Sequence, residues 1–404
     1  MNKLKELLKK FFVKAGPSLI LVAGVLGPGS LAVSSKVGAT MGYSVLWVLI
    51  IVFVMMALFA RLGRIIGTLS DDSIIEMARI KYGGKTTGYI LGIAGFVVTM
   101  GFQTGNNIGI GLAMNAIFGG SMGLWAVIFT SIVLVLIWWK NDVYNTVEKV
   151  MTGLVLLMVI SFFANLFVVD IDVKEFALGF IPTKPTIFVL VIAMSATTFS
   201  VISAVIQAYL VKDKKWTKAT LKENLKGSTI GVVILAAISG VIIITSAAVL
   251  RPQGIVPSSA VEMGLQLEPL LGATSKWLFL FGLFSASFSS FVVNAFSGGL
   301  LLADGFKLGK SYNNKYVKIF ASLLMILSTI IVLYINENPV ELLVVAQAST
   351  AVVVPIFAVL IIALSNSKKL MGEYRIGKVG NAIGIAALFW VFYLSYSQIM
   401  SFIG

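Results

Sequence analysis

Two short segments of the sequence combine residues that would expose backbone groups inside an apolar stretch. Gly27-Pro28-Gly29-Ser30 interrupts the apolar run at residues 16–37. Proline removes a backbone donor and clashes with the preceding helical turn, and the flanking glycines let the chain unwind. Such a break presents carbonyl oxygens and amides to a ligand, and Ser30 is placed to cap the helix that follows. The N-terminus of that helix would favour a negatively charged group.

The second segment, Ala196-Thr197-Thr198-Phe199-Ser200, lies within the apolar run at residues 186–211. It holds no glycine or proline, so a break is predicted here only because threonine and serine compete for backbone hydrogen bonds. Other polar residues that fall within apolar runs are Gln103, Asn106, Ser289, Ser290 and Gln347. Each of these has two interpretations: a ligand contact, or a hydrogen bond that joins two helices.

The residue types that are missing exclude several kinds of chemistry. The chain has no histidine and no cysteine, so a thiol nucleophile, a histidine base and a Cys/His metal site are excluded. The 17 carboxylates fall in loops or at the ends of apolar runs. We therefore predict no enzyme activity, no cofactor and no resident metal site. Tight binding of a bare divalent cation is also not expected, because such sites usually use carboxylates.

The composition shows what kind of scaffold must position these groups. Of the 404 residues, 58% are hydrophobic and 12% are charged, with a mean hydropathy of +0.99. This excludes a water-soluble enzyme, a nucleic-acid-binding domain and a disordered chain, and predicts a multi-pass membrane protein with the lipid bilayer as its partner. Eleven apolar runs are long enough to cross a bilayer, near residues 16–37, 43–61, 88–117, 121–139, 150–169, 186–211, 228–250, 277–303, 317–335, 340–364 and 380–402.

The basic residues predict the orientation. With eleven spans and a cytoplasmic N-terminus, 26 of the 31 Lys and Arg residues fall on the cytoplasmic side. This is the bias of the positive-inside rule, and it puts the C-terminus outside the cytoplasm. The net charge of +14 thus indicates topology rather than a nucleic-acid partner. Residues 1–14 predict a basic amphipathic segment on the inner leaflet. The sequence does not predict an oligomeric state.

Several segments resemble the natural resistance-associated macrophage protein (NRAMP) family. The run GATMGYSVLWVLIIVFVMMALFARLG at 38–63 is similar to the stretch from span one to span two of that family. Shorter similarities, in chain order, are NAIFG at 115–119, GFIP at 179–182, EPLLG at 268–272 and VVAQAS at 344–349. Together they cover spans one to ten.

The resemblance implies an all-α integral membrane protein of the LeuT type. Two inverted repeats of five spans, residues 15–185 and 186–365, would be followed by a loop and an eleventh span at 366–404. It also implies ion-coupled secondary transport by alternating access. Divalent transition metals are the usual cargo of the family, together with protons. The compact size and short loops favour a bacterial plasma membrane.

The chain departs from the family at the residues that hold the metal. The resemblance places Gly27 where the family has aspartate, Ser30 where it has asparagine, and Phe199 where it has a methionine ligand. Ala196 matches an alanine that binds through its carbonyl, and Ser200 and Val201 replace a Pro-His pair. Gln103 and Asn106 stand where family members commonly carry acids of the proton path. The scaffold is thus expected without its metal ligands.

Three functions remain open at this point. The main interpretation is a secondary transporter for a small organic acid or zwitterion. Its coupling ion would be Na⁺, held by span-one carbonyls and by Ser289 and Ser290, or H⁺, carried by acids at span ends. The alternative is a divalent metal transporter with a water-mediated site. The third is a membrane receptor or scaffold that does not transport.

Overall fold

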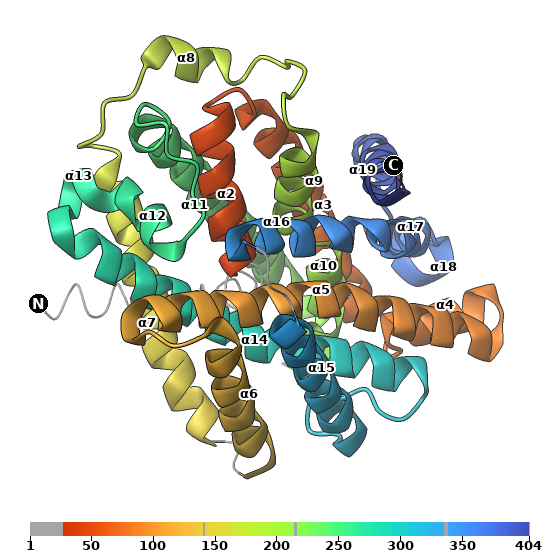
Figure 1. Cartoon of the computed structure of the whole chain (residues 1–404). Coiled ribbons are helices and arrows are strands. Elements are labelled where there is room, and N and C mark those ends of the chain that lie inside the picture. Colours follow the sequence, from red (N-terminus) through yellow and green to blue (C-terminus); the bar gives the residue numbers. More distant parts are fainter. Residues whose placement is uncertain (1–26, 140–141, 214–215, 335–337, 404) are drawn as a thin grey trace, which may run out of the picture.

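The part of the chain that the structure describes is built of helices (Figure 1). The computed structural model describes residues 27–139, 142–213, 216–334 and 338–403. No strand occurs within these ranges. The predicted amphipathic segment 1–14 and the first part of span one lie outside them. The all-α fold that the sequence predicts is confirmed.

In chain order the α-helices are α2 (Pro28–Met41), α3 (Leu46–Leu69), α4 (Ile74–Tyr82), α5 (Gly84–Phe118), α6 (Met122–Trp139), α7 (Asp142–Asn165), α8 (Val173–Leu178), α9 (Phe188–Thr198), α10 (Val201–Asp213), α11 (Leu221–Val249), α12 (Ala260–Gly264), α13 (Glu268–Leu271), α14 (Ser275–Gly305), α15 (Lys315–Tyr334), α16 (Pro339–Ser349), α17 (Val354–Ser365), α18 (Lys368–Met371) and α19 (Lys378–Ile403). Eight helical segments of the described residues are long and apolar enough to cross a membrane. A ninth is formed if α16 and α17 count as one bent span. The count of eleven spans therefore stays a prediction.

Helices α5 and α14 run antiparallel side by side through the middle of the molecule (Figure 1). Glycines let their backbones approach closely, as is usual for membrane helices. A Cβ on Gly92 would lie 2.8 Å from the Cα of Gly305, and a Cβ on Gly298 would lie 2.2 Å from the hydroxyl of Thr99. The same register, continued along α5, brings Asn106 opposite Ser290. The packing of this pair therefore decides which polar residues meet at mid-helix.

The helix that the sequence predicts at 186–211 is broken. Helix α9 ends at Thr198, α10 begins at Val201, and Phe199 has non-helical backbone angles. The hydroxyl of Ser200 accepts a hydrogen bond from the amide of Ser203 at 3.3 Å, so Ser200 caps α10. A serine cap thus replaces the glycine or proline that usually marks such a break.

Two helix boundaries differ from the predicted ones. The span predicted at 340–364 is divided into α16 and α17, which meet at an angle of 44°. Helix α3 extends to Leu69, beyond the predicted end at residue 61, so Arg64 lies on a helix rather than in a loop. Arg64 is completely buried, and its Nε donates a hydrogen bond to Oε1 of Gln207 at 2.8 Å. This contact ties α3 to α10, and a second hydrogen bond, from the guanidinium to the carbonyl oxygen of Asn224, ties α3 to α11.

Candidate functional site

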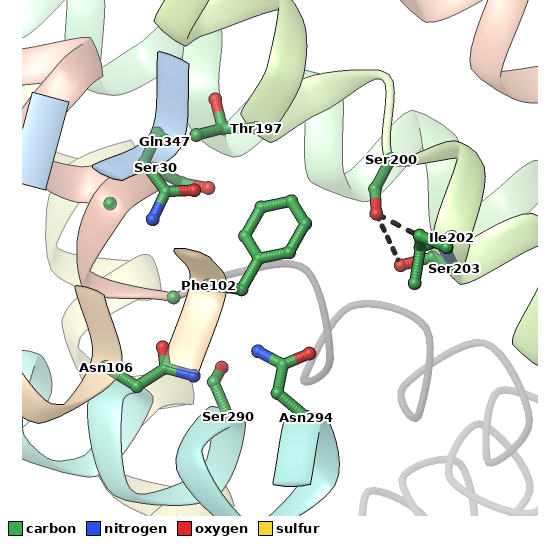
Figure 2. A pocket seen from close by; sticks show the side chains of 12 residues that line it. Ser30, Phe102, Asn106, Thr197, Ser200, Ile202, Ser203, Ser290, Asn294 and Gln347 are labelled. Carbon is green, nitrogen blue, oxygen red and sulfur yellow. Dashed lines mark hydrogen bonds between the residues drawn. The ribbon is translucent and has the colours of Figure 1, made fainter. Parts of the chain in front are cut away.

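A small cavity lies where the broken helices meet α5, α14 and α16 (Figure 2). It is lined by Gly27, Gly29, Ser30, Phe102, Asn106, Thr197, Ser200, Ile202, Ser203, Ser290, Asn294 and Gln347. Its volume of about 20 Å³ has room for little more than one water molecule or an ion of similar size. In this conformation the cavity is thus too small for an organic solute of several heavy atoms.

Helix ends supply backbone groups to this cavity. Helix α2 begins here with Gly27 as its N-cap, and no side chain caps it. Helix α9 ends here, so its last carbonyl oxygens lack partners within the helix. The hydroxyl of Thr197 donates to the carbonyl of Met194 at 3.0 Å and stays on its own helix. The cavity therefore meets both a positive helix end, at α2, and a negative one, at α9.

Helices α5 and α14 supply the carboxamide and hydroxyl groups. Phe102 and Asn106 are one turn apart on α5, and Ser290 and Asn294 are one turn apart on α14. Figure 2 shows the Ser290 hydroxyl between the carboxamides of Asn106 and Asn294. Because the two helices are antiparallel, the close contacts described above for the glycines of α5 and α14 continue along both helices to these polar residues.

Gln347 of α16 closes the cavity beside the first turn of α2. A Cβ on Gly29 would lie 2.3 Å from Cδ of Gln347, and a Cβ on Gly105 would lie 2.7 Å from its Nε2. The Gln347 side chain therefore occupies the space that larger residues at these two positions would need. Figure 2 shows its carboxamide beside Ser30.

The lining residues carry no ionisable side chain. Within the described ranges, no group of three or more Asp, Glu, His or Cys residues is placed to hold a metal ion. Several amide atoms are nevertheless buried without a hydrogen-bond partner in these ranges: Nδ2 of Asn106 and both polar atoms of Gln103. Of these two residues only Asn106 lines the cavity, and its unpartnered Nδ2 is a donor that an acceptor atom, such as a water oxygen, would satisfy.

The structure brings eight of the predicted site residues together and leaves six outside the cavity. Gly27, Gly29, Ser30, Asn106, Thr197, Ser200, Ser290 and Gln347 line it, whereas Pro28, Gln103, Ala196, Thr198, Phe199 and Ser289 do not.

The excluded residues lie on other helix faces. Ala196 and Phe199 line a separate small cavity with residues of α19, and Pro28 lies against Gly109 of α5. Ser289 directly precedes Ser290, and adjacent helical residues point about 100° apart. Of the two serines predicted to hold a coupling ion, only Ser290 lines this cavity, and their role as ion ligands stays a prediction.

Four lining residues were not predicted as site residues: Phe102, Ile202, Ser203 and Asn294. Two of them follow a simple pattern, since Phe102 lies one turn before Asn106 and Asn294 one turn after Ser290. Helical spacing from the predicted residues would have found them. Ile202 and Ser203 follow the break after α9, whose exact position the sequence did not indicate.

The family follows from comparison with known sequences. The sequence model of the family described as natural resistance-associated macrophage protein-like matches residues 18–401. The chain belongs to this family. It is similar to a divalent metal cation transporter MntH of Caldanaerobacter subterraneus subsp. tengcongensis, with 24% identity, covering 96% of this chain and 93% of that protein. An MntH of Listeria welshimeri is 22% identical, covering 91% of this chain and 84% of the relative.

Solved structures support the NRAMP fold. A manganese transporter of Eremococcus coleocola, in complex with an aromatic bis-isothiourea substituted compound, superimposes with a TM-score of 0.76 at 17% identity, covering 98% of this chain and 89% of that one. MhsT in complex with L-phenylalanine gives a TM-score of 0.60 at 15% identity, covering 96% and 97%. The chain is thus a multi-pass membrane transporter with a LeuT-type fold.

Proposed function

We propose that this NRAMP protein carries a divalent metal cation by alternating access and binds it through neutral oxygen atoms with part of its hydration shell retained. One observation carries the proposal: an ion-sized cavity lined by carboxamide, hydroxyl and backbone oxygens lies at the start of α2 and at the break between α9 and α10. The MntH relatives support a metal cargo better than the organic solute that the sequence favoured.

The retained hydration follows from the ligands. Without a carboxylate, the protein cannot replace all the water of a divalent ion, and Mg²⁺ in particular gives up its water reluctantly. The last carbonyls of α9 carry the negative end of a helix dipole and would favour a cation. No sulfur or imidazole lines the cavity, so hard ions such as Mg²⁺ and Mn²⁺ suit it better than softer ones such as Cd²⁺.

Ion coupling and orientation stay predictions. We favour Na⁺ over H⁺ as the coupling ion, because no titratable side chain lines the cavity. Of the two predicted serines, only Ser290 faces this cavity. A plasma-membrane location with a cytoplasmic N-terminus and an outer C-terminus rests on the distribution of basic residues.

A small organic acid is the second candidate. Helix α2 begins at the cavity without a side-chain cap, so its first amides are oriented as donors to a negative group. This candidate requires a more open conformation in which the cavity is larger.

Flux into proteoliposomes separates the candidates. Vesicles that contain the protein and a metal-sensitive dye are exposed to Mn²⁺ or to Mg²⁺, beside vesicles without protein. Protein-dependent entry of either ion supports the proposal. Entry of neither ion, from protein shown to be folded, contradicts it. Sodium-driven uptake of labelled organic acids by the same vesicles would then favour the second candidate.

A further inference from the structure

One side chain of α5 fills the space at the start of α2, where Gly27 has no side chain. A Cβ on Gly27 would lie 3.1 Å from Oδ1 of Asn106 and 3.5 Å from Oγ of Ser290. An ion in the cavity beside residue 27 therefore meets an oxygen that comes from α5.

The surroundings of Asn106 do not account for its presence by packing alone. Asn106 is 3% exposed and lines the cavity, with its Oδ1 next to Gly27, and this oxygen is the atom that could contact a cation. Its Nδ2 is a donor without a hydrogen-bond partner in the described ranges and would not itself bind a cation. An apolar side chain of similar size would avoid the cost of an unpartnered buried amide. The neighbouring Asn107 differs in that it does not line the cavity and its Nδ2 donates to Oγ1 of Thr329 at 2.8 Å, although its Oδ1 has no partner in the described ranges.

We infer that Asn106 is a cation ligand of this transporter: its carboxamide oxygen contacts the cargo ion, or a water bound to it, beside Gly27. The inference rests on the proposed function and names the residue that sets the strength of the site. Since a carboxamide oxygen is neutral, the ion keeps more of its water and is held more weakly than by a carboxylate.

The strength of divalent-ion binding follows from the same geometry. The packing of α5 against α14 places Asn106 opposite Ser290. The carboxamide oxygen of Asn106 is therefore held in place by two long packed helices rather than by a loop. A carboxylate at position 106 would add a negative charge at the same place with almost no change in volume. The structure therefore predicts that the single change Asn106→Asp strengthens divalent binding.

The test compares variants of two adjacent asparagines in the full-length protein. Asn106→Leu removes the oxygen and keeps the size, Asn106→Asp adds a charge, and Asn107→Leu is the matched control outside the cavity. Mn²⁺ entry into proteoliposomes gives KM and maximal rate, and the folded fraction is measured for each variant. We expect Asn106→Leu to raise KM about tenfold or more, the scale seen when partners of a bound metal are removed. Asn106→Asp should lower KM, and Asn107→Leu should leave it unchanged.

The possible outcomes separate a failure of this inference from a failure of the proposed function. An unchanged KM in folded Asn106→Leu, or an equal rise in the Asn107 control, overturns the inference while the metal function stands. If Asn106→Leu does not fold, an unchanged KM in the nearly isosteric Asn106→Asp overturns it. If the wild-type protein moves neither Mn²⁺ nor Mg²⁺, the proposed function fails first, and the inference with it.

Discussion

Two polar clusters lie on different faces of α5, and they differ in how their hydrogen bonds are satisfied. On one face, Asn107 joins a cluster with hydroxyls of α6 and α15. Its Nδ2 donates to Thr329 at 2.8 Å and to Ser328 at 3.3 Å, and the Thr130 and Thr329 hydroxyls are 2.7 Å apart. On the other face, Nδ2 of Asn106 has no partner in the described ranges, and the side chain borders a cavity.

The difference separates a structural role from a binding role. Both asparagines are buried, and they are adjacent in the sequence, so composition and hydropathy cannot distinguish them. The donors of the Asn107 cluster are used by protein groups, which fixes α6 and α15 against α5. In the Asn106 cluster, Nδ2 of Asn106 has no partner in the described ranges and the side chain borders the cavity. Because Oδ1 of Asn107 also lacks a partner, it is the adjoining cavity, and not the unmade hydrogen bond alone, that distinguishes the Asn106 face.

The largest effect on transport is expected from a side chain that fills the cavity. Gly29→Leu should abolish transport, because its side chain would overlap Gln347, whose Cδ lies 2.3 Å from where the new Cβ would be. The same overlap should lower stability by about 1–3 kcal/mol. Uptake and the folded fraction are measured together. Gly153→Leu is the control, since a Cβ there meets no atom within 4 Å. Retained uptake in Gly29→Leu would contradict the assignment of the site.

Removing the hydrogen bonds of Asn107, on the other face of α5, should lower the stability of the protein rather than its uptake activity. Asn107→Leu leaves the hydroxyls of Thr329 and Ser328 without their donor, and we expect it to destabilise the protein by about 1–3 kcal/mol. Thermal unfolding in detergent measures this loss, and the KM for uptake should not change. A shift in KM without a loss of stability would remove the distinction between the two faces.

A carboxylate added at the start of α2 tests whether the cavity beside Asn106 binds a cation. Gly27→Asp should improve divalent cation binding, because carboxylates are stronger ligands for these ions than neutral oxygens. The gain is limited by Oδ1 of Asn106, which lies only 3.1 Å from the Cβ position. Gly27→Asp combined with Asn106→Ser makes room for the new carboxylate but removes the carboxamide oxygen, so it should bind less tightly than Gly27→Asp alone if Asn106 is a ligand. Stabilisation against heat by added Mn²⁺ measures both variants. If neither variant gains affinity, the cavity does not hold the ion.

The sequence predicted the parts of this site that depend on local chemistry. Gly27-Pro28-Gly29-Ser30 marked the start of α2, because proline and glycine interrupt a helix whatever surrounds them. The break after α9 was only weakly indicated, since a serine cap and non-helical angles at Phe199 produce it without glycine or proline. Which of Gln103, Asn106 and Asn107 borders the cavity depends on the close packing of α5 against α14, a tertiary property that no single-helix pattern contains.

The smallest effect separates Ser289 from Ser290. Only Ser290 lines the cavity, although both serines are buried on α14. If Na⁺ binds at the break of α2, Ser290→Ala should weaken the sodium dependence of uptake, whereas Ser289→Ala should leave it as in the wild type. Uptake is measured against Na⁺ concentration with choline as the replacement ion. The effect is expected to be modest, because a hydroxyl is one of several neutral oxygens at the site. An equal response of the two variants would show that sodium acts elsewhere, and the hydroxyl of Ser290 would then belong, like those of Thr130 and Thr329, to the packing of the helices.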